Sequence, residues 1–290
     1  MRIIDLTNNL FEFFDDNRFN IERWKNYIDS NILNLKELCL KDMEESLEKG
    51  FSFNDDYLPI LSSVINNKDK LNKLKESFYN VTNNLDERII KRFNRSIDCD
   101  IILYLGLLNG AGWVTELNNK TVILLGIEKI IELNWCDIDS MNGLIIHELG
   151  HAYHMEFGIL RKDFKDTSDE LLYELYEEGI AMVFEQEVIG DPNYFHQNDN
   201  EWKMWCSNNL NLLKTSFYND LSTMNHDNQR YFGDWVYFNG HNDTGYFLGA
   251  KFIRYLLNSD SFDSIITYDI DKIRDEYILF MNKNNWKISF

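Results

Sequence analysis

The chain has 290 residues, of which 44% are hydrophobic and 14% aromatic, and its formal net charge is -19. This length and composition are typical of a folded globular protein and exclude a disordered chain. The acidic balance argues against nucleic acid and anionic membrane surfaces as partners, because both repel negative charge.

The N-terminus and the cysteines favour a cytoplasmic protein, although secretion without a leader stays open. Asp5 stands where a signal peptide needs its apolar stretch, and no run of about 18 apolar residues suggests a transmembrane helix. The chain has no Cys-x-x-Cys pair, so we expect reduced thiols at its four separate cysteines, which are Cys39, Cys99, Cys136 and Cys206. The oligomeric state is not indicated.

The first third of the chain has a helical pattern. Between residues 20 and 93 apolar side chains recur at intervals of three and four, as at Ile32, Leu35 and Leu38. Gly50 is placed to end one of these helices. No residue of this section suggests chemistry, so we interpret it as a helical region that supports the rest.

A small sheet is predicted to follow. Residues 100–106 have the apolar character of a buried strand, and the strands 113–117 and 121–125 flank Asn118 and Asn119, a plausible hairpin turn. Helical periodicity returns after this sheet.

The change of period sets the predicted domain boundary near residue 97. We therefore expect a helical N-terminal region at residues 1–97 and a second domain at residues 98–290. The predicted fold class is α+β and mostly helical, with about three strands in one small mixed sheet.

The residues that indicate chemistry lie in the segment 140–154. It contains His147, Glu148 and His151 in the order His-Glu-x-x-His on an amphipathic helix, with Asp139 or Ser140 available as N-cap. Residues four apart share one helix face, so both imidazoles can bind a single metal ion. Glu148 adjoins the first ligand and can take a proton from the metal-bound water.

Chance is the alternative explanation for this motif. The two histidines would then make only ordinary hydrogen bonds within the core. The apolar residues Leu144, Ile145 and Ile146 argue against chance, because a buried helix holds metal ligands rigidly.

A catalytic zinc site usually has three protein ligands, so one more is expected downstream. The metzincin pattern would put a histidine where Phe157 stands and a glycine where His154 stands, which excludes that pattern. Thr167 and Glu170 form a capping box that predicts another helix. Glu174 and Glu178 both lie on it as possible ligands.

The sequence Glu178-Gly179-Ile180-Ala181 resembles the signature that gluzincins carry on the helix after their His-Glu-x-x-His motif. This resemblance implies a thermolysin-like catalytic core and one Zn²⁺ per chain, with Glu178 as third ligand in preference to Glu174. It also implies an edge strand beside the active-site helix, near residues 121–125, that binds extended substrate. Small residues after the ligand would let two helices approach closely around the ion.

Two departures from the gluzincin pattern are visible. Met182 stands where thermolysin-like enzymes carry an aspartate, and the Gly-x-Met-Glu-Asn motif of aminopeptidases is missing. The chain is also loosely similar to predicted zinc-dependent proteases of unknown role.

The donor that would stabilise an oxyanion is sought in the segment 234–250, where a polar loop leads into a helix. Tyr246 is the first candidate and His241 the second, by analogy with the Tyr or His of gluzincins. His154 lies on a helix face similar to that of His147 and is a further candidate, as a ligand or as a neighbour of one.

Taken together, the sequence predicts a zinc-dependent peptidase with Glu148 as general base and a peptide or protein as substrate. One alternative is a catalytically inactive metal-binding module that holds a peptide or protein partner. A metal-dependent hydrolase of another bond is the second alternative, because hydrolytic zinc chemistry is shared across substrates.

Overall fold

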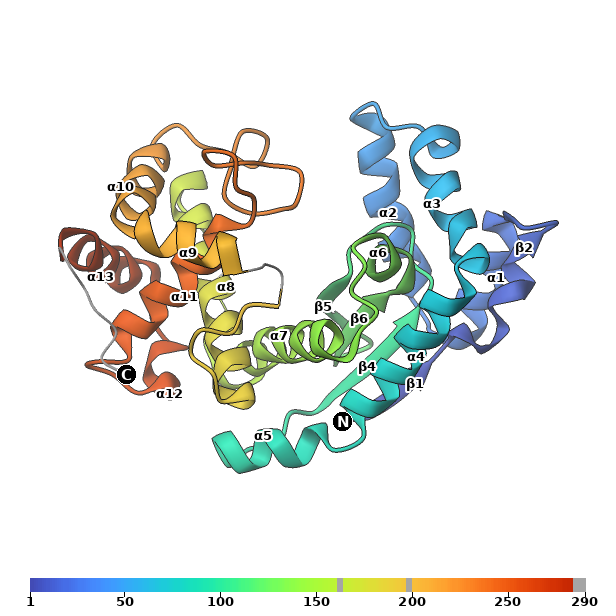
Figure 1. Cartoon of the computed structure of the whole chain (residues 1–290), viewed down its shortest axis with the longest axis horizontal. Helices are drawn as coiled ribbons and strands as arrows, with labels where there is room; N and C mark the ends of the chain where they lie inside the picture. Colours follow the sequence, from blue (N-terminus) through green and yellow to red (C-terminus); the bar gives the residue numbers. More distant parts are fainter. Residues whose placement is uncertain (161–163, 197–199, 284–290) are drawn as a thin grey trace. The chain divides into compact units, whose positions relative to one another are not determined.

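The computed structural model describes residues 1–160, 164–196 and 200–283. It forms two compact units, Met1–Glu148 and Leu149–Phe290, whose boundary falls inside the continuous helix α7 (Ile138–Phe157) (Figure 1). The boundary predicted at residue 97 does not coincide with this division. The physical reason is that the first strand of the chain belongs to the same sheet as the strand that begins at Cys99.

The sheet of the N-terminal unit has four strands in the order β1-β4-β6-β5. Strands β1 and β4 are parallel, β4 and β6 are parallel, and β5 is antiparallel to β6. The bounds are β1 Arg2–Asp5, β4 Cys99–Tyr104, β5 Gly112–Leu117 and β6 Lys120–Gly126. The three predicted strands and the mixed α+β class are thus confirmed, and β1 is the strand of this sheet that the sequence did not predict.

The hairpin between β5 and β6 turns at Asn118 and Asn119, as predicted. Both residues have positive φ, 54° and 61°, which matches a type I′ turn and the right-handed twist of the flanking strands. The prediction that residues 121–125 form the edge strand is wrong. Strand β6 lies between β4 and β5, and β5 is the edge. Alternation of side chains identifies strands but does not reveal their order in a sheet.

Helices surround this sheet in the N-terminal unit, as Figure 1 shows. They are α1 Ile21–Asn31, α2 Leu35–Glu48, α3 Leu58–Ser63, α4 Lys68–Thr82, α5 Leu85–Phe93 and α6 Ile127–Glu132. Short elements complete the unit: a 3₁₀ helix at Thr7–Phe13, a π turn at Phe53–Tyr57, a 3₁₀ turn at Val64–Asn66 and the hairpin strands β2 Phe14–Asp15 and β3 Arg18–Phe19. Gly50 follows α2 with φ at +104°, as expected of a helix end.

Polar contacts tie the sheet to these helices. The fully buried Trp24 of α1 donates its Nε1–H to the Leu105 carbonyl at 2.7 Å. Asp100 of β4 is buried and pairs with Arg2 of β1 and with Lys120 of β6. All four cysteines are buried free thiols, as predicted.

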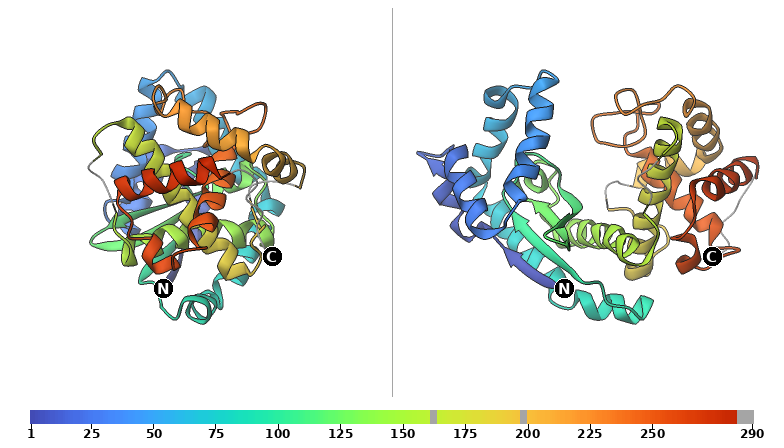
Figure 2. Two further views of the ribbon diagram at one scale, coloured as in Figure 1. Left: turned by 90° about the vertical axis from the view of Figure 1, so that its left-hand side faces the viewer. Right: turned by 180° about the vertical axis from the view of Figure 1, so that it is seen from behind.

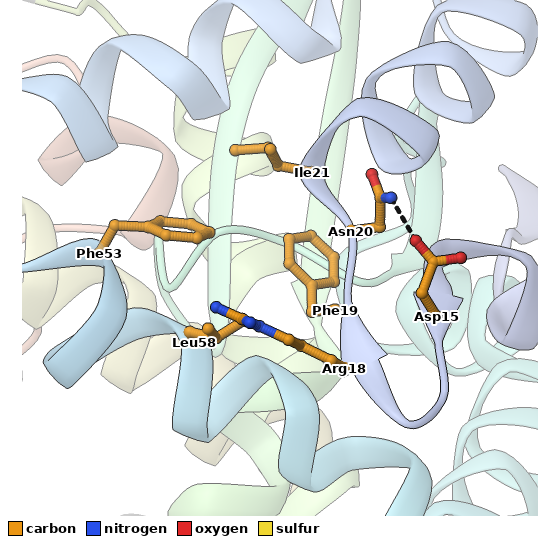
Figure 3. A pocket seen from close by; sticks show the side chains of 7 residues that line it. All are labelled: Asp15, Arg18, Phe19, Asn20, Ile21, Phe53 and Leu58. Atoms are coloured by element: carbon orange, nitrogen blue, oxygen red, sulfur yellow. Dashed lines mark hydrogen bonds between the residues drawn. The ribbon is translucent and has the colours of Figure 1, made fainter.

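A hollow of about 290 Å³ opens in the N-terminal unit beside the β2-β3 hairpin (Figure 3). Figure 3 shows the rings of Phe19 and Phe53 and the Arg18 side chain around it, with Asn20 bonded to Asp15. Its lining residues are Asp15, Arg18, Phe19, Asn20, Ile21, Phe53 and Leu58. The lining contains none of the predicted site residues.

Within the described residues, the regular secondary structure of the C-terminal unit consists of helices (Figure 2). After α7 these are α8 Thr167–Ile189, α9 Asn200–Asn208, α10 Leu210–Asp220, α11 Thr244–Leu256, α12 Phe262–Ile265 and α13 Ile270–Asn282. A search of the described helices finds none with the length and apolar composition that crossing a bilayer requires.

Candidate metal centre

Helix α7 carries the His-Glu-x-x-His motif, as the sequence predicts. The helix starts two or three residues earlier than expected, because Asp137 is the residue that caps it. The Asp137 carboxylate accepts the N–H groups of Asp139 and Ser140 at 3.1 and 3.0 Å, and also the Ser140 hydroxyl at 2.9 Å. The N-cap assignment to Asp139 or Ser140 is therefore wrong.

Helix α8 carries the predicted carboxylate ligand near its middle. Its N-cap is Asp166, which accepts the N–H of Asp169 at 3.0 Å. The capping box predicted at Thr167 and Glu170 is thus displaced by one residue, although the helix itself is confirmed. The preference of the N-cap for aspartate over threonine explains the displaced start of α8.

His147, His151 and Glu178 come together. One nitrogen from each imidazole and one carboxylate oxygen lie within 4.8 Å of one another. His147 is buried, whereas His151 and Glu178 keep 16% and 21% of their side-chain surface exposed. The two histidines are held by the continuous helix α7, and His151 and Glu178 belong to the same compact unit.

The donor atoms are of the kinds that bind divalent metal ions such as zinc. Two imidazole nitrogens and one carboxylate oxygen are the ligand set of many catalytic zinc sites, which leave the fourth position open. Bond lengths of about 2.0 to 2.1 Å place two ligands of a tetrahedral ion about 3.4 Å apart. His151 Nε2 and Glu178 Oε2 are 3.4 Å apart. These residues could therefore hold a divalent metal ion, although the ion's identity is open.

Gly179 and Ala181 both allow close helix contacts, as predicted, but each residue faces a different helix. Gly150 of α7 lies against the backbone of Ala181 of α8. Gly179 instead faces α11, where an added Cβ atom would stand 2.5 Å from the Gly249 carbonyl oxygen. The glycine after the ligand therefore serves the contact between α8 and α11, and Ala181 serves the contact with α7.

Glu148, the predicted general base, is buried beside the edge strand. A Cβ atom added at Gly112, the first residue of β5, would stand 2.6 Å from Glu148 Oε1. Only glycine therefore leaves the carboxylate in its present position. The edge strand beside the motif helix is thus β5, and its first residue lies against the predicted base.

Glu174, the alternative ligand, lies outside the metal cluster found among the described residues. Burial, and to a smaller extent the nearby Glu178 carboxylate, raises the pKa of its carboxyl to about 7. Burial also raises the pKa of Glu177. The helix thus carries several carboxylates, and Glu178 is the one that approaches both histidines.

Tyr246 and His241, the predicted oxyanion donors, lie within and just before α11. The Tyr246 ring packs edge-on against Phe232 with centroids 5.5 Å apart, and the His241 ring stacks on Trp205 at 4.0 Å. Neither residue is part of the three-ligand cluster. Their catalytic role stays a prediction.

His226 is a residue that the sequence did not single out. It follows α10, and its Nε2 lies 3.3 Å from Glu170 Oε2 near the start of α8, with both side chains about half exposed. It also lies close enough to Glu174 to lower the pKa of that carboxyl. A lone histidine in a polar loop gives no local signal, so only the folded chain reveals this proximity.

No family model, curated protein or solved structure matches the chain. The likeness to gluzincins therefore depends on the motif residues alone and stays a prediction.

Proposed function

We propose that this protein is a zinc-dependent peptidase. The observation that carries the proposal is the convergence of His147, His151 and Glu178 on one small volume, with Glu148 buried next to the first ligand. Three ligands of this kind are typical of catalytic rather than structural zinc sites, which are closed by a fourth protein ligand.

The roles of the residues follow from their chemistry. A divalent ion held by the three ligands supplies Lewis acidity toward a carbonyl oxygen and lowers the pKa of water toward neutrality. Glu148 accepts the proton of the attacking water and delivers it to the leaving amine. Tyr246 and His241 are the candidates for donating a hydrogen bond to the developing oxyanion.

Strand β5 supports a peptide as the substrate. It is the edge of the sheet, so one side of its backbone is not paired within the sheet. An extended peptide can pair with such an edge through main-chain hydrogen bonds. Because Gly112 at the start of this strand contacts Glu148, a peptide aligned along β5 would pass close to the base.

A metal-binding module without activity is the principal competing function. Such a module would need the three ligands but not Glu148. Glu148 is not one of the three ligands and lies beside Gly112 instead. A hydrolase acting on another bond would use the same four residues.

The variant Glu148→Gln tests the proposal. It keeps the size of the side chain and removes the base, so we expect hydrolysis of a peptide library to fall by several orders of magnitude while zinc content is retained. Glu156→Gln, an exposed substitution on the same helix, serves as the control. Hydrolysis that survives Glu148→Gln would contradict the mechanism, and a wild type that binds zinc but cleaves no peptide would favour the binding module.

A further inference from the structure

His154 is fully buried in the C-terminal unit, and neither of its ring nitrogens makes a hydrogen bond of good geometry. Burial, together with the smaller effect of the neighbouring His151, lowers the pKa of His154 to about 4. The imidazole is therefore neutral at physiological pH, with one N–H donor and one acceptor. A buried donor without a partner costs about 1 to 3 kcal/mol in general, so this position calls for an explanation.

One nitrogen of His154 faces α8. The ring packs beside the rings of Tyr173 and Tyr176. The Ile266 carbonyl lies near enough to the ring to raise the pKa of His154, but neither nitrogen meets it with the geometry of a hydrogen bond. The closest carboxylate oxygen is Glu177 Oε1, 4.0 Å from Nδ1. This separation exceeds a direct hydrogen bond and suits a single bridging water.

Two histidine-carboxylate pairs thus connect α7 to α8. His151 faces Glu178 at 3.4 Å, and His154, almost one turn later on α7, faces Glu177 at 4.0 Å. Glu177 and Glu178 are adjacent, so their side chains leave α8 about 100° apart, as 3.6 residues per turn require. A contact that holds the Glu177 side chain in one direction therefore also sets the rotation of α8 about its own axis. That rotation determines whether Glu178 points to the metal.

We propose that His154 is a positioning residue for the metal centre: its Nδ1–H donates through one water to Glu177 and so holds Glu178 in place as a ligand. This inference rests on the proposed metal centre. A role in packing alone does not require histidine, because a phenyl ring would fill the same apolar site without a buried donor. Residues that orient metal ligands typically change metal affinity by roughly 10- to 100-fold when removed.

The test compares zinc affinity with the stability of the metal-free protein. His154→Phe keeps a ring and removes the donor, His154→Asn keeps a donor near the Nδ1 position, and Glu177→Ala removes the acceptor. Tyr153→Phe is the matched control, because Tyr153 is a buried donor on the same helix that bonds Asp263 instead, at 3.0 Å. Zinc dissociation constants come from competition with a chromophoric chelator, and stability comes from thermal unfolding without metal.

We expect His154→Phe and Glu177→Ala each to weaken zinc binding by roughly 10-fold or more, and the double variant to be no weaker than the singles. The metal-free His154→Phe protein should unfold at the wild-type temperature or above it, and His154→Asn should recover most of the affinity. Tyr153→Phe should keep wild-type zinc affinity.

Wild-type affinity in Glu177→Ala would overturn the inference and leave the metal centre standing, even if His154→Phe failed to fold. Wild-type affinity in His154→Phe would do the same. A wild-type protein that binds no zinc would overturn both this inference and the proposed function.

Discussion

Gly150 of α7 touches Ala181 of α8 backbone to backbone: a Cβ atom added at Gly150 would stand 2.7 Å from the Ala181 Cα. This contact lies one residue from the ligand His151 and three from the ligand Glu178. The spacing of the two helices at this point therefore bears directly on the geometry of the proposed centre.

Substituting Gly150 by alanine should separate α7 from α8. Alanine favours a helix by about 1 kcal/mol over glycine, but the overlap with a backbone that cannot yield costs more, and overpacking typically destabilises by about 1 to 3 kcal/mol. We expect a lower urea midpoint and weaker zinc binding. Glu156→Ala, an exposed change on α7, should alter neither. A more stable Gly150→Ala protein with full zinc affinity would contradict the close contact.

Gly112→Ala should affect catalysis without affecting the fold. The added methyl group would stand 2.6 Å from Oε1 and 2.8 Å from Cγ of Glu148, so the whole Glu148 side chain must move away from β5. We expect peptide hydrolysis to fall by at least roughly 10-fold while zinc content and thermal stability stay at wild-type values. Thr115→Ala, on the opposite face of β5, provides the comparison. Full activity in Gly112→Ala would show that the position of Glu148 beside β5 is not needed.

The buried carboxyl of Glu128 should make the protein less stable as the pH rises from about 4.5 to about 7. Its buried carboxylate accepts the N–H groups of Gly106 and Leu108 at 2.8 and 3.1 Å, yet burial raises the pKa to about 7. A carboxyl whose pKa is higher in the folded than in the unfolded chain stabilises the fold at pH values below its unfolded pKa. This stabilisation is lost as the pH rises through the folded pKa. The expected loss is about 3 kcal/mol in all.

The variant Glu128→Gln isolates this effect because glutamine does not ionise. It should be less stable than wild type at pH 5, where it loses one of the two backbone bonds, and the difference should shrink or reverse by pH 8. Urea midpoints at the two pH values measure it. If the difference in urea midpoint between wild type and Glu128→Gln were the same at pH 5 and pH 8, Glu128 would not titrate in this range.

The contribution of Asp100 to stability should depend on pH in the opposite direction. Burial by itself raises the pKa of its carboxyl, but hydrogen bonds and charge from Arg2 and Lys120 prevail and lower it. Stability from this group is therefore present above the unfolded pKa and is lost as the pH falls through the folded one. Asp100→Asn should lower the thermal midpoint at pH 7 and reduce the further loss between pH 5 and pH 3. An Asn variant with the wild-type acid profile would contradict this.

The local elements were predictable because their signals are local. The period of two and the Asn118-Asn119 turn identified β5 and β6, and the four-residue spacing placed His147 and His151 on one face of α7. Glu178 followed from its likeness to a known signature, and the structure confirms that it approaches both histidines. These inferences needed no knowledge of long-range contacts.

The remaining features depend on contacts between distant residues. Strand β1 is short, and only its pairing with β4 makes Arg2–Asp5 part of the sheet. The edge position of β5 depends on strand order, which alternation does not encode. The proximity of His154 to Glu177 could not be foreseen either, because it depends on the packing of α7 against α8, to which the close approach of Gly150 and Ala181 contributes.

Zinc content tests the central claim most directly. We would measure zinc by elemental analysis in wild type, His151→Ala, Glu178→Ala and the control Glu170→Ala, an exposed carboxylate on the same helix. The predicted result is about one zinc per chain in wild type and in Glu170→Ala, with zinc lost or much reduced in the two ligand variants. A wild-type protein without tightly bound metal after zinc is supplied, or a Glu178→Ala protein that keeps its zinc, would contradict the three-ligand centre.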